Sequence, residues 1–191
     1  MATYRIVVVA ASAGGLTALT AVLGRLPATF GLPIAIVQHI DPHHVSRLAE
    51  ILGRRAQVRV KQADDGDVLA PGVAYIAPPG QHLVVAGGGM LTLTNTAPVH
   101  FSRPSADRLF ESAARAFSPA IGVILTGTGT DGATGAAAIK ASGGVMIVQD
   151  EATSAFFGMP HAAIDAGAVD YILPLDEIAA TLVRLAGSDE P

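Results

Sequence analysis

The feature that most constrains the fold is a repeated alternation of short, branched apolar runs with segments that carry apolar residues at helical spacing. The first apolar run, residues 4–10, leads into the small, glycine-containing turn 11–15. Leu16, Leu19, Val22, Leu23 and Leu26 follow at the three- and four-residue spacing that places side chains on one face of a helix. Buried strands joined by helices form parallel sheets, so the pattern predicts an α/β fold.

The same rhythm predicts the remaining elements. We expect strands over 33–38, 58–61, 121–126, 145–149 and 169–173, and helices over 45–54, after Ser105, and over 131–142, 160–166 and 175–185. Between residues 63 and 98, Pro and Gly pairs separate short strands near 73–76, 83–85 and 91–94, and the triplet 87–89 predicts a hairpin turn. The expected fold is one doubly wound, mostly parallel sheet with helices on both faces and a β-hairpin excursion near its middle.

Composition narrows the classes of protein that this chain can belong to. Half of the 191 residues are hydrophobic and 15% are charged, which is typical of a globular domain with one core. The chain has no cysteine, which excludes disulfides, thiolate metal sites and a cysteine nucleophile and favours the cytoplasm. No apolar run approaches about 18 residues, so no membrane insertion is expected. A net charge of −4 without a cluster of Lys or Arg argues against nucleic-acid binding.

Three polar residues follow predicted strands. Ser12 comes after the first strand, His39 directly after the second, and Asp131 lies in the glycine-rich turn after the strand at 121–126. Sites in doubly wound sheets form at the carboxyl ends of strands. A serine, an imidazole and a carboxylate can supply the nucleophile, the base and the orienting acid of ester hydrolysis, and glycines beside Ser12 would let backbone amides approach an oxyanion.

Each of these residues also has a structural interpretation. Ser12 and Asp131 could cap the helices that follow them, and His39 could bond a loop carbonyl at a strand end. The cluster His39, Asp41, His43 and His44 could suggest a metal, but Pro42 prevents His39 and His43 from sharing one face of a helix, so we expect no metal site.

Nucleotide binding is a further alternative for the glycine-rich turns. No lysine follows the glycines of 127–132, Ala10 stands in place of the first glycine of a dinucleotide fingerprint, and the second strand ends in Gln38-His39 rather than in an acid. These features disfavour a nucleotide. Arg103, a lone cation before a helix in an acidic chain, is a candidate contact for a carboxylate-rich substrate, with an ordinary surface arginine as the alternative.

Six motifs, taken in order, resemble the catalytic domain of the chemotaxis protein-glutamate methylesterases, the CheB family. They are Ala-Ser-Ala-Gly-Gly (11–15), Val-Gln-His-Ile-Asp-Pro (37–42), residues 65–80, Arg-Pro-Ser-Ala-Asp (103–107), Leu-Thr-Gly-Thr-Gly-Thr-Asp-Gly-Ala (125–133) and Phe-Gly-Met-Pro-His-Ala-Ala (157–163). The resemblance spans residues 6–182. It implies that Ser12, His39 and Asp131 match the nucleophile, the base and the orienting acid of the family.

The resemblance also implies a substrate and a reaction. The expected activity is hydrolysis of glutamyl methyl esters on the cytoplasmic helices of chemoreceptors, with deamidation of glutamines as a second activity and no cofactor. Backbone amides near Ala13 and Thr128 would hold the oxyanion. The family usually has glycine at position 10, threonine at 13 and methionine at 128, so side-chain contributions around the oxyanion should differ here. The rival function is a non-catalytic interaction module of a sensory system.

Family members commonly carry an N-terminal receiver domain. We expect residues 1–191 to form a single catalytic domain without one, because the first predicted strand begins within five residues of Met1. Control of the activity would then come from a separate regulatory protein, unless the chain is a domain of a longer product.

Overall fold

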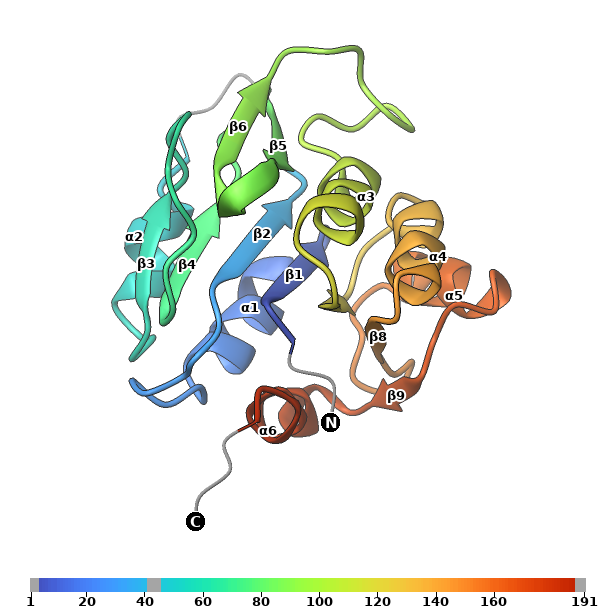
Figure 1. Cartoon of the computed structure of the whole chain (residues 1–191). Coiled ribbons are helices and arrows are strands. Elements are labelled where there is room, and N and C mark those ends of the chain that lie inside the picture. The colour runs from blue at the N-terminus through green and yellow to red at the C-terminus, as the bar shows by residue number, and fades with distance from the viewer. Residues whose placement is uncertain (1–3, 41–45, 188–191) are drawn as a thin grey trace.

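The predicted α/β architecture is confirmed by the computed structural model, which describes residues 4–40 and 46–187 (Figure 1). Seven strands form one sheet in the order β3-β4-β2-β1-β7-β8-β9, and every pairing between them is parallel. The strands are β1 (Ile6–Ala11), β2 (Ile34–Gln38), β3 (Arg59–Gln62), β4 (Val73–Ile76), β7 (Ala120–Ile124), β8 (Val145–Gln149) and β9 (Tyr171–Leu173). The chain order reverses at β1, so the carboxyl ends of β1, β2 and β7 share one edge.

Helices cover both faces of this sheet. One face carries α1 (Gly15–Leu23), α2 (Leu48–Gly53) and α6 (Leu175–Leu185), and the other carries α3 (Ala106–Ala116), α4 (Ala133–Ala141) and α5 (Gly158–Asp165). Alternate residues of β1 serve the two cores: Val8 packs on the side of α3, whereas Val7 and Val9 pack on the side of α1. The all-apolar sequence of β1 follows from burial on both faces.

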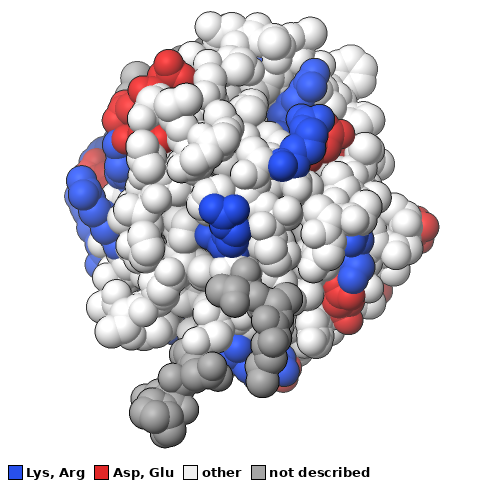
Figure 2. Space-filling model, viewed as in Figure 1, with Lys and Arg blue, Asp and Glu red and all other residues white. Residues whose placement is uncertain are grey.

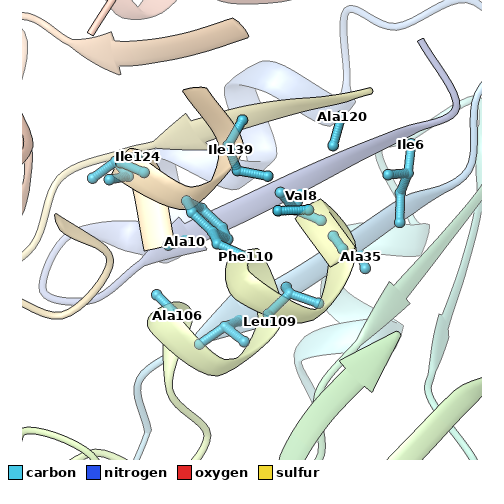
Figure 3. Close-up of a cluster of buried hydrophobic side chains, with 14 of the residues drawn as sticks. Ile6, Val8, Ala10, Ala35, Ala106, Leu109, Phe110, Ala120, Ile124 and Ile139 are labelled. Carbon is cyan, nitrogen blue, oxygen red and sulfur yellow. The ribbon is translucent and has the colours of Figure 1, made fainter. Parts of the chain in front are cut away.

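The core under α3 and α4 combines one large ring with small strand residues (Figure 3). Phe110 of α3 is fully buried and lies among Val8, Ala10 and Ile139 in the labelled cluster. A Cβ on Gly135 of α4 would lie 2.6 Å from the Cβ of Phe110, so this glycine lets α3 and α4 approach closely. Burying a phenylalanine of this kind contributes about 1.5–3 kcal/mol, so the position of α3 is well determined.

The hairpin predicted near the middle of the chain is present as a separate two-stranded antiparallel sheet. It consists of β5 (His82–Val85) and β6 (Leu91–Thr94), joined by the 3₁₀ turn η1 (Gly87–Gly89). Gly88 and Gly89 have φ angles of 72° and 78°, a region that favours glycine. The N–H of Val85 donates to the Ser112 hydroxyl of α3 at 3.0 Å, so the hairpin is tied to the helix.

Three helices differ from their predicted bounds, and one of them is α5, which is expected over 160–166 and observed as Gly158–Asp165. The helix expected over 45–54 is observed as Leu48–Gly53, and residues 41–45 lie outside the described part of the chain. The helix expected over 131–142 begins at Ala133, because Gly132 precedes it as a left-handed N-cap with a φ angle of 104°. Asp131 therefore stands outside the helix, where its side chain can point to other partners.

No helix within residues 4–40 and 46–187 is both long and apolar enough to cross a membrane. On the face shown in Figure 2, Lys and Arg occur as separate small groups on a mostly uncharged surface, some of them beside Asp or Glu.

Candidate active site

The register of the two central strands brings Ser12 and His39 to adjacent positions. β1 and β2 pair in parallel as far as Ala11 and Gln38, and the N–H of His39 then donates to the carbonyl of Ala11 at 2.9 Å. Ser12 and His39 are thus the next residues on neighbouring chains at the carboxyl edge of the sheet. Both are half-buried, which leaves each accessible from that edge.

His39 and Asp131 are in direct contact. The distance between His39 Nε2 and Asp131 Oδ2 is 2.8 Å, and the two side chains are 15% and 3% exposed. Because the carboxylate can only accept, the proton of the neutral imidazole lies on Nε2. Nδ1 is then the nitrogen that is free to act as a base.

The carboxylate of Asp131 is held by the N-terminus of α3. Its oxygens accept from the N–H of Ala106 at 2.7 Å, from the N–H of Asp107 at 3.0 Å and from the hydroxyl of Ser105 at 2.8 Å. Burial works to raise the pKa of Asp131, but the hydrogen bonds from His39, from these two amides and from Ser105 outweigh it and hold the pKa below its ordinary value. Asp131 is therefore ionised at neutral pH.

Asp131 and Ser12 do not cap the helices that follow them. Gly132 is the N-cap of α4 and Gly14 is the N-cap of α1, so neither N-cap residue has a side chain that can bond its helix. The structural alternative for both residues is wrong, because a left-handed glycine separates each from its helix. For His39, the contact with Asp131 replaces the loop carbonyl that the alternative required.

Ser12 is fixed through its backbone. Its N–H donates to the carbonyl of Thr126 at 3.0 Å, which ties it to the loop after β7. A Cβ at Gly127 would lie 2.8 Å from the Cβ of Ser12, so this close approach requires glycine. Within the described residues the Ser12 hydroxyl makes no hydrogen bond, so the structure joins two of the three predicted catalytic residues and places the third beside them.

Two loops carry the amides predicted to face an oxyanion. The Thr126 hydroxyl donates to the carbonyl of Ala13 at 2.9 Å and links the loops. The N–H of Gly127 donates to the carbonyl of Phe156, and the carbonyl of Gly127 accepts from the N–H of Met159, both at 2.9 Å. Among the residues that the structure describes, the N–H groups of Ala13 and Thr128 have no partner. Both amides therefore remain available on loops that flank Ser12.

A pocket of 340 Å³ opens beside His39. It is lined by His39, Ile40, Pro98, Phe101, Ser102, Arg103 and Pro104. Arg103 Nη1 donates to the carbonyls of Asn95 and Thr96 at 3.2 and 3.1 Å, so part of the guanidinium fastens the loop before α3. Its Nε is buried and has no partner within the described residues.

The sequence does not predict a place in the site for several residues that the structure puts there. Phe101, at the rim of the pocket, is fully exposed with a φ angle of 63°, and nothing in the sequence distinguishes it from an ordinary loop residue. Ser105, after which the sequence predicts a helix, caps α3, and its hydroxyl also donates to Asp131. His82, at the start of β5, is fully buried. Its Nδ1 accepts from the Ser105 N–H at 3.1 Å, and burial lowers its pKa, so the neutral ring holds the start of α3.

Asp107 is a second buried carboxylate beside Asp131. Its Oδ1 accepts from the N–H of Gly132 at 3.0 Å and from the N–H of Gly135 at 2.7 Å. Burial is the main cause that raises its pKa above the ordinary value, and the negative charge of Asp131 adds to it, against the hydrogen bonds of the two glycines and the charge of His100. The Arg-Pro-Ser-Ala-Asp motif pointed to this residue but not to its partners.

No group of three or more potential ligands able to hold a metal occurs among residues 4–40 and 46–187. Asp41, His43 and His44, which formed the candidate metal cluster with His39, lie outside the described residues.

Comparison with known proteins gives one family. The model of the CheB methylesterase family matches residues 7–182. A protein-glutamate methylesterase/protein-glutamine glutaminase of Anaeromyxobacter dehalogenans is 48% identical over 185 residues, which are 96% of this chain and 54% of that protein. A putative enzyme of the same name from Leptospira interrogans is 40% identical over 95% of both chains. The crystal structure of the Thermotoga maritima CheB methylesterase catalytic domain matches with a TM-score of 0.91 and 38% identity, over 95% of this chain and 98% of that one.

The length of these relatives differs. The chain spans about half of several of the curated relatives that it matches, and nearly the whole of the Leptospira protein.

Proposed function

The chain belongs to the CheB methylesterase family, and we propose that it is a serine esterase that hydrolyses glutamyl methyl esters on the cytoplasmic helices of chemoreceptors. The observation that carries the proposal is the contact of 2.8 Å between His39 and Asp131, on the edge of the sheet where Ser12 leaves the adjacent strand. The names of the relatives support the reaction and support deamidation of receptor glutamines as a second activity.

In the proposed mechanism, His39 Nδ1 takes the proton of Ser12 as Oγ attacks the ester carbonyl. Asp131 keeps the other ring proton on Nε2 and stabilises the imidazolium that forms. His39 then protonates the departing methoxide, and methanol leaves an acyl-enzyme on Ser12. Water, activated by the same imidazole, attacks the acyl group and restores the serine and a free glutamate.

The oxyanion would be held by the amides of Ala13 and Thr128. Their N–H groups have no partner within the described residues. Ala13 follows Ser12 directly, Thr128 lies in the loop after β7, and hydrogen bonds of Thr126 to Ser12 and Ala13 hold the two loops together. Donors fixed before the reaction stabilise charge that develops only in the transition state. The substitutions from the usual family residues at these two positions leave the backbone donors in place.

The pocket beside His39 is the proposed entry for the methylated side chain. Arg103 lines it and is the proposed contact for the acidic receptor surface, in addition to its bonds to the loop carbonyls. An Arg103→Ala variant is expected to raise KM more than it lowers kcat. The proposed location is the cytoplasm, and the proposed partners are the receptor and a separate regulatory protein.

The decisive experiment measures methanol released from methylated receptor cytoplasmic fragments by the purified chain and by Ser12→Ala. We expect release by the parent and none above background by the variant, because the triad acts as a unit. Thr20→Ala, on the exposed side of α1, is the matched control and should retain the parent rate, since its hydroxyl bonds only the carbonyl of Leu16. Hydrolysis by Ser12→Ala at the parent rate would refute the proposal. Receptor binding without methanol release would instead favour the non-catalytic module.

A further inference from the structure

Gln38 connects the two chain segments that carry the nucleophile and the base. It is the last residue of β2 and is 6% exposed. Its Nε2 donates to the carbonyl of Ser12 at 2.8 Å and to the carbonyl of His39 at 3.0 Å. One side-chain amide thus uses both of its hydrogens to join the backbones of Ser12 and His39.

The backbone makes no comparable link at this point. The pairing of β1 with β2 ends with the bond from the His39 N–H to Ala11, and Ser12 then turns away to bond Thr126 of the next loop. Beyond the end of the ladder, the distance between Ser12 and His39 depends on whatever spans the two segments. The Gln38 amide is the group that spans them.

The carbonyl oxygen of the Gln38 side chain indicates that this residue does not serve mainly to stabilise the fold. Gln38 Oε1 is buried and has no hydrogen-bond partner within the described residues. A buried unpaired acceptor costs free energy that a leucine of similar size would avoid. A Cβ on Gly15 would overlap this oxygen, so the first residue of α1 accommodates the glutamine.

We propose that Gln38 is a positioning residue that sets the separation of Ser12 from His39 during catalysis. The proposal rests on the esterase function proposed above. Its physical basis is that the reacting groups must meet within a few tenths of an ångström, and a displacement of about 1 Å can lower a rate by about 100-fold. Gln38 touches neither the substrate nor the reacting atoms, and it acts through the two carbonyls.

The test compares Gln38→Leu and Gln38→Glu with the parent, using methanol release from methylated receptor fragments and the labelling rate of Ser12 by a fluorophosphonate. Gln38→Leu removes both donors, so kcat and the labelling rate are expected to fall about 10- to 100-fold while KM changes little. Ser112→Ala is the matched control, because it removes a buried hydroxyl that bonds the N–H of Val85 and the carbonyl of Leu109 and none of the three proposed catalytic residues. It should lower stability and leave kcat near the parent value.

The pH dependence of Gln38→Glu separates positioning from a general loss of stability. A buried carboxyl facing two carbonyl oxygens has a raised pKa, and its protonated form can donate to one of them whereas its ionised form repels both. The ratio of its kcat to the parent kcat should therefore rise as the pH is lowered from about 8 towards 6, and the ratio for Gln38→Leu should stay constant. The pH dependence of Gln38→Glu also tests the positioning role if Gln38→Leu does not fold.

The outcomes distinguish this inference from the function on which it rests. If the parent neither releases methanol nor reacts with the fluorophosphonate, the esterase function fails. If the parent is active but Gln38→Leu keeps kcat within twofold, or Gln38→Glu shows no pH-dependent recovery, the esterase function stands and the positioning role is refuted.

Discussion

Asp131 and Asp107 occupy matching places in the fold, yet the structure shifts their pKa values in opposite directions. Each carboxylate belongs to the start of one helix and accepts amide N–H groups from the start of the other: Asp131 from α3, and Asp107 from Gly132 and Gly135 around the start of α4. Burial raises the pKa of both. The pKa of Asp131 is nonetheless lowered, whereas that of Asp107 is raised.

The difference lies in the donors that surround each group. Asp131 accepts from His39 and the Ser105 hydroxyl in addition to two amides, all at 3.0 Å or less. Asp107 has two amides, and its other oxygen faces His100 at the longer distance of 3.4 Å. Burial therefore does not decide the charge state by itself. The donors at short range also contribute, and the carboxylate that orients His39 has the larger set. The negative charge of Asp131 further raises the pKa of Asp107.

The largest expected effect is a difference in catalytic rate between variants of Asp131 and of Asp107. Asp131→Asn should lower kcat by roughly 10⁴-fold, because an amide cannot keep the proton of His39 on Nε2 or stabilise the imidazolium. Asp107→Asn is the matched variant. Its Oδ1 can still accept from Gly132 and Gly135, so the rate of methanol release should stay within about tenfold of the parent, since one neutral hydrogen bond contributes about 1 kcal/mol. Equal losses in both variants would remove the distinction.

A smaller effect concerns the stability that Asp107 provides. Asp107→Ala leaves two buried amides without an acceptor and should lower the free energy of unfolding by about 2–3 kcal/mol, measured by urea denaturation. Asp107→Asn should lose less than half of that. If the alanine variant is as stable as the asparagine variant, the two glycine amides do not depend on this side chain.

Ser105→Ala tests the extra donor of Asp131. The change removes the hydroxyl that donates to Asp131 and that caps α3 through the N–H of Arg108. We expect a loss of about 1 kcal/mol in unfolding free energy and a fall of about tenfold in kcat, since a hydrogen bond to a charged group contributes about 1.5 kcal/mol. Ser142→Ala, whose hydroxyl bonds the carbonyl of Ile139 at the end of α4, is the control and should leave kcat unchanged. A parent-like kcat for Ser105→Ala would show that three donors suffice.

The smallest effect is a pH dependence of stability. The pKa of Asp107 is raised in the folded state, so the folded protein holds this proton more tightly than the unfolded chain. The resulting stabilisation is fully present below the unfolded pKa of about 3.9 and is lost as the pH rises through the folded value. The unfolding free energy of the parent minus that of Asp107→Asn should therefore fall as the pH rises from about 4 through the raised pKa of Asp107. The contribution of Asp131 to the unfolding free energy has the opposite pH dependence: it is present above about pH 3.9 and is lost as the pH falls through the lowered pKa of Asp131. Because both proteins contain Asp131, this contribution largely cancels in the difference between their unfolding free energies.

Measuring both proteins by urea denaturation across this range gives the comparison. A difference that stays constant or rises with pH would contradict the raised pKa of Asp107.

The sequence predicts what depends on local pattern. The periods of the apolar residues identified the strands and helices within a few residues, and the ends of three strands placed Ser12, His39 and Asp131 on one edge of the sheet. It could not predict that Asp131 would bond α3 rather than the nearer α4, because that choice depends on how two helices some 25 residues apart in sequence approach each other. The hydrogen bonds of Gln38 to the carbonyls of Ser12 and His39 likewise depend on how the two chain segments are placed beyond the end of the strands.

The exchange of carboxylates between α3 and α4 has a consequence for folding. Asp107 in the first turn of α3 and Asp131 in the turn just before α4 each accept amides at the start of the other helix, so neither helix start can fray without exposing the carboxylate that serves its neighbour. The two helix starts and the orientation of His39 should therefore open as one cooperative unit, with the amides of Ala106, Asp107, Gly132 and Gly135 exchanging their hydrogens at similar rates. A partly unfolded molecule would then have an unoriented imidazole, and hydrolysis would be confined to chains in which both helices are docked.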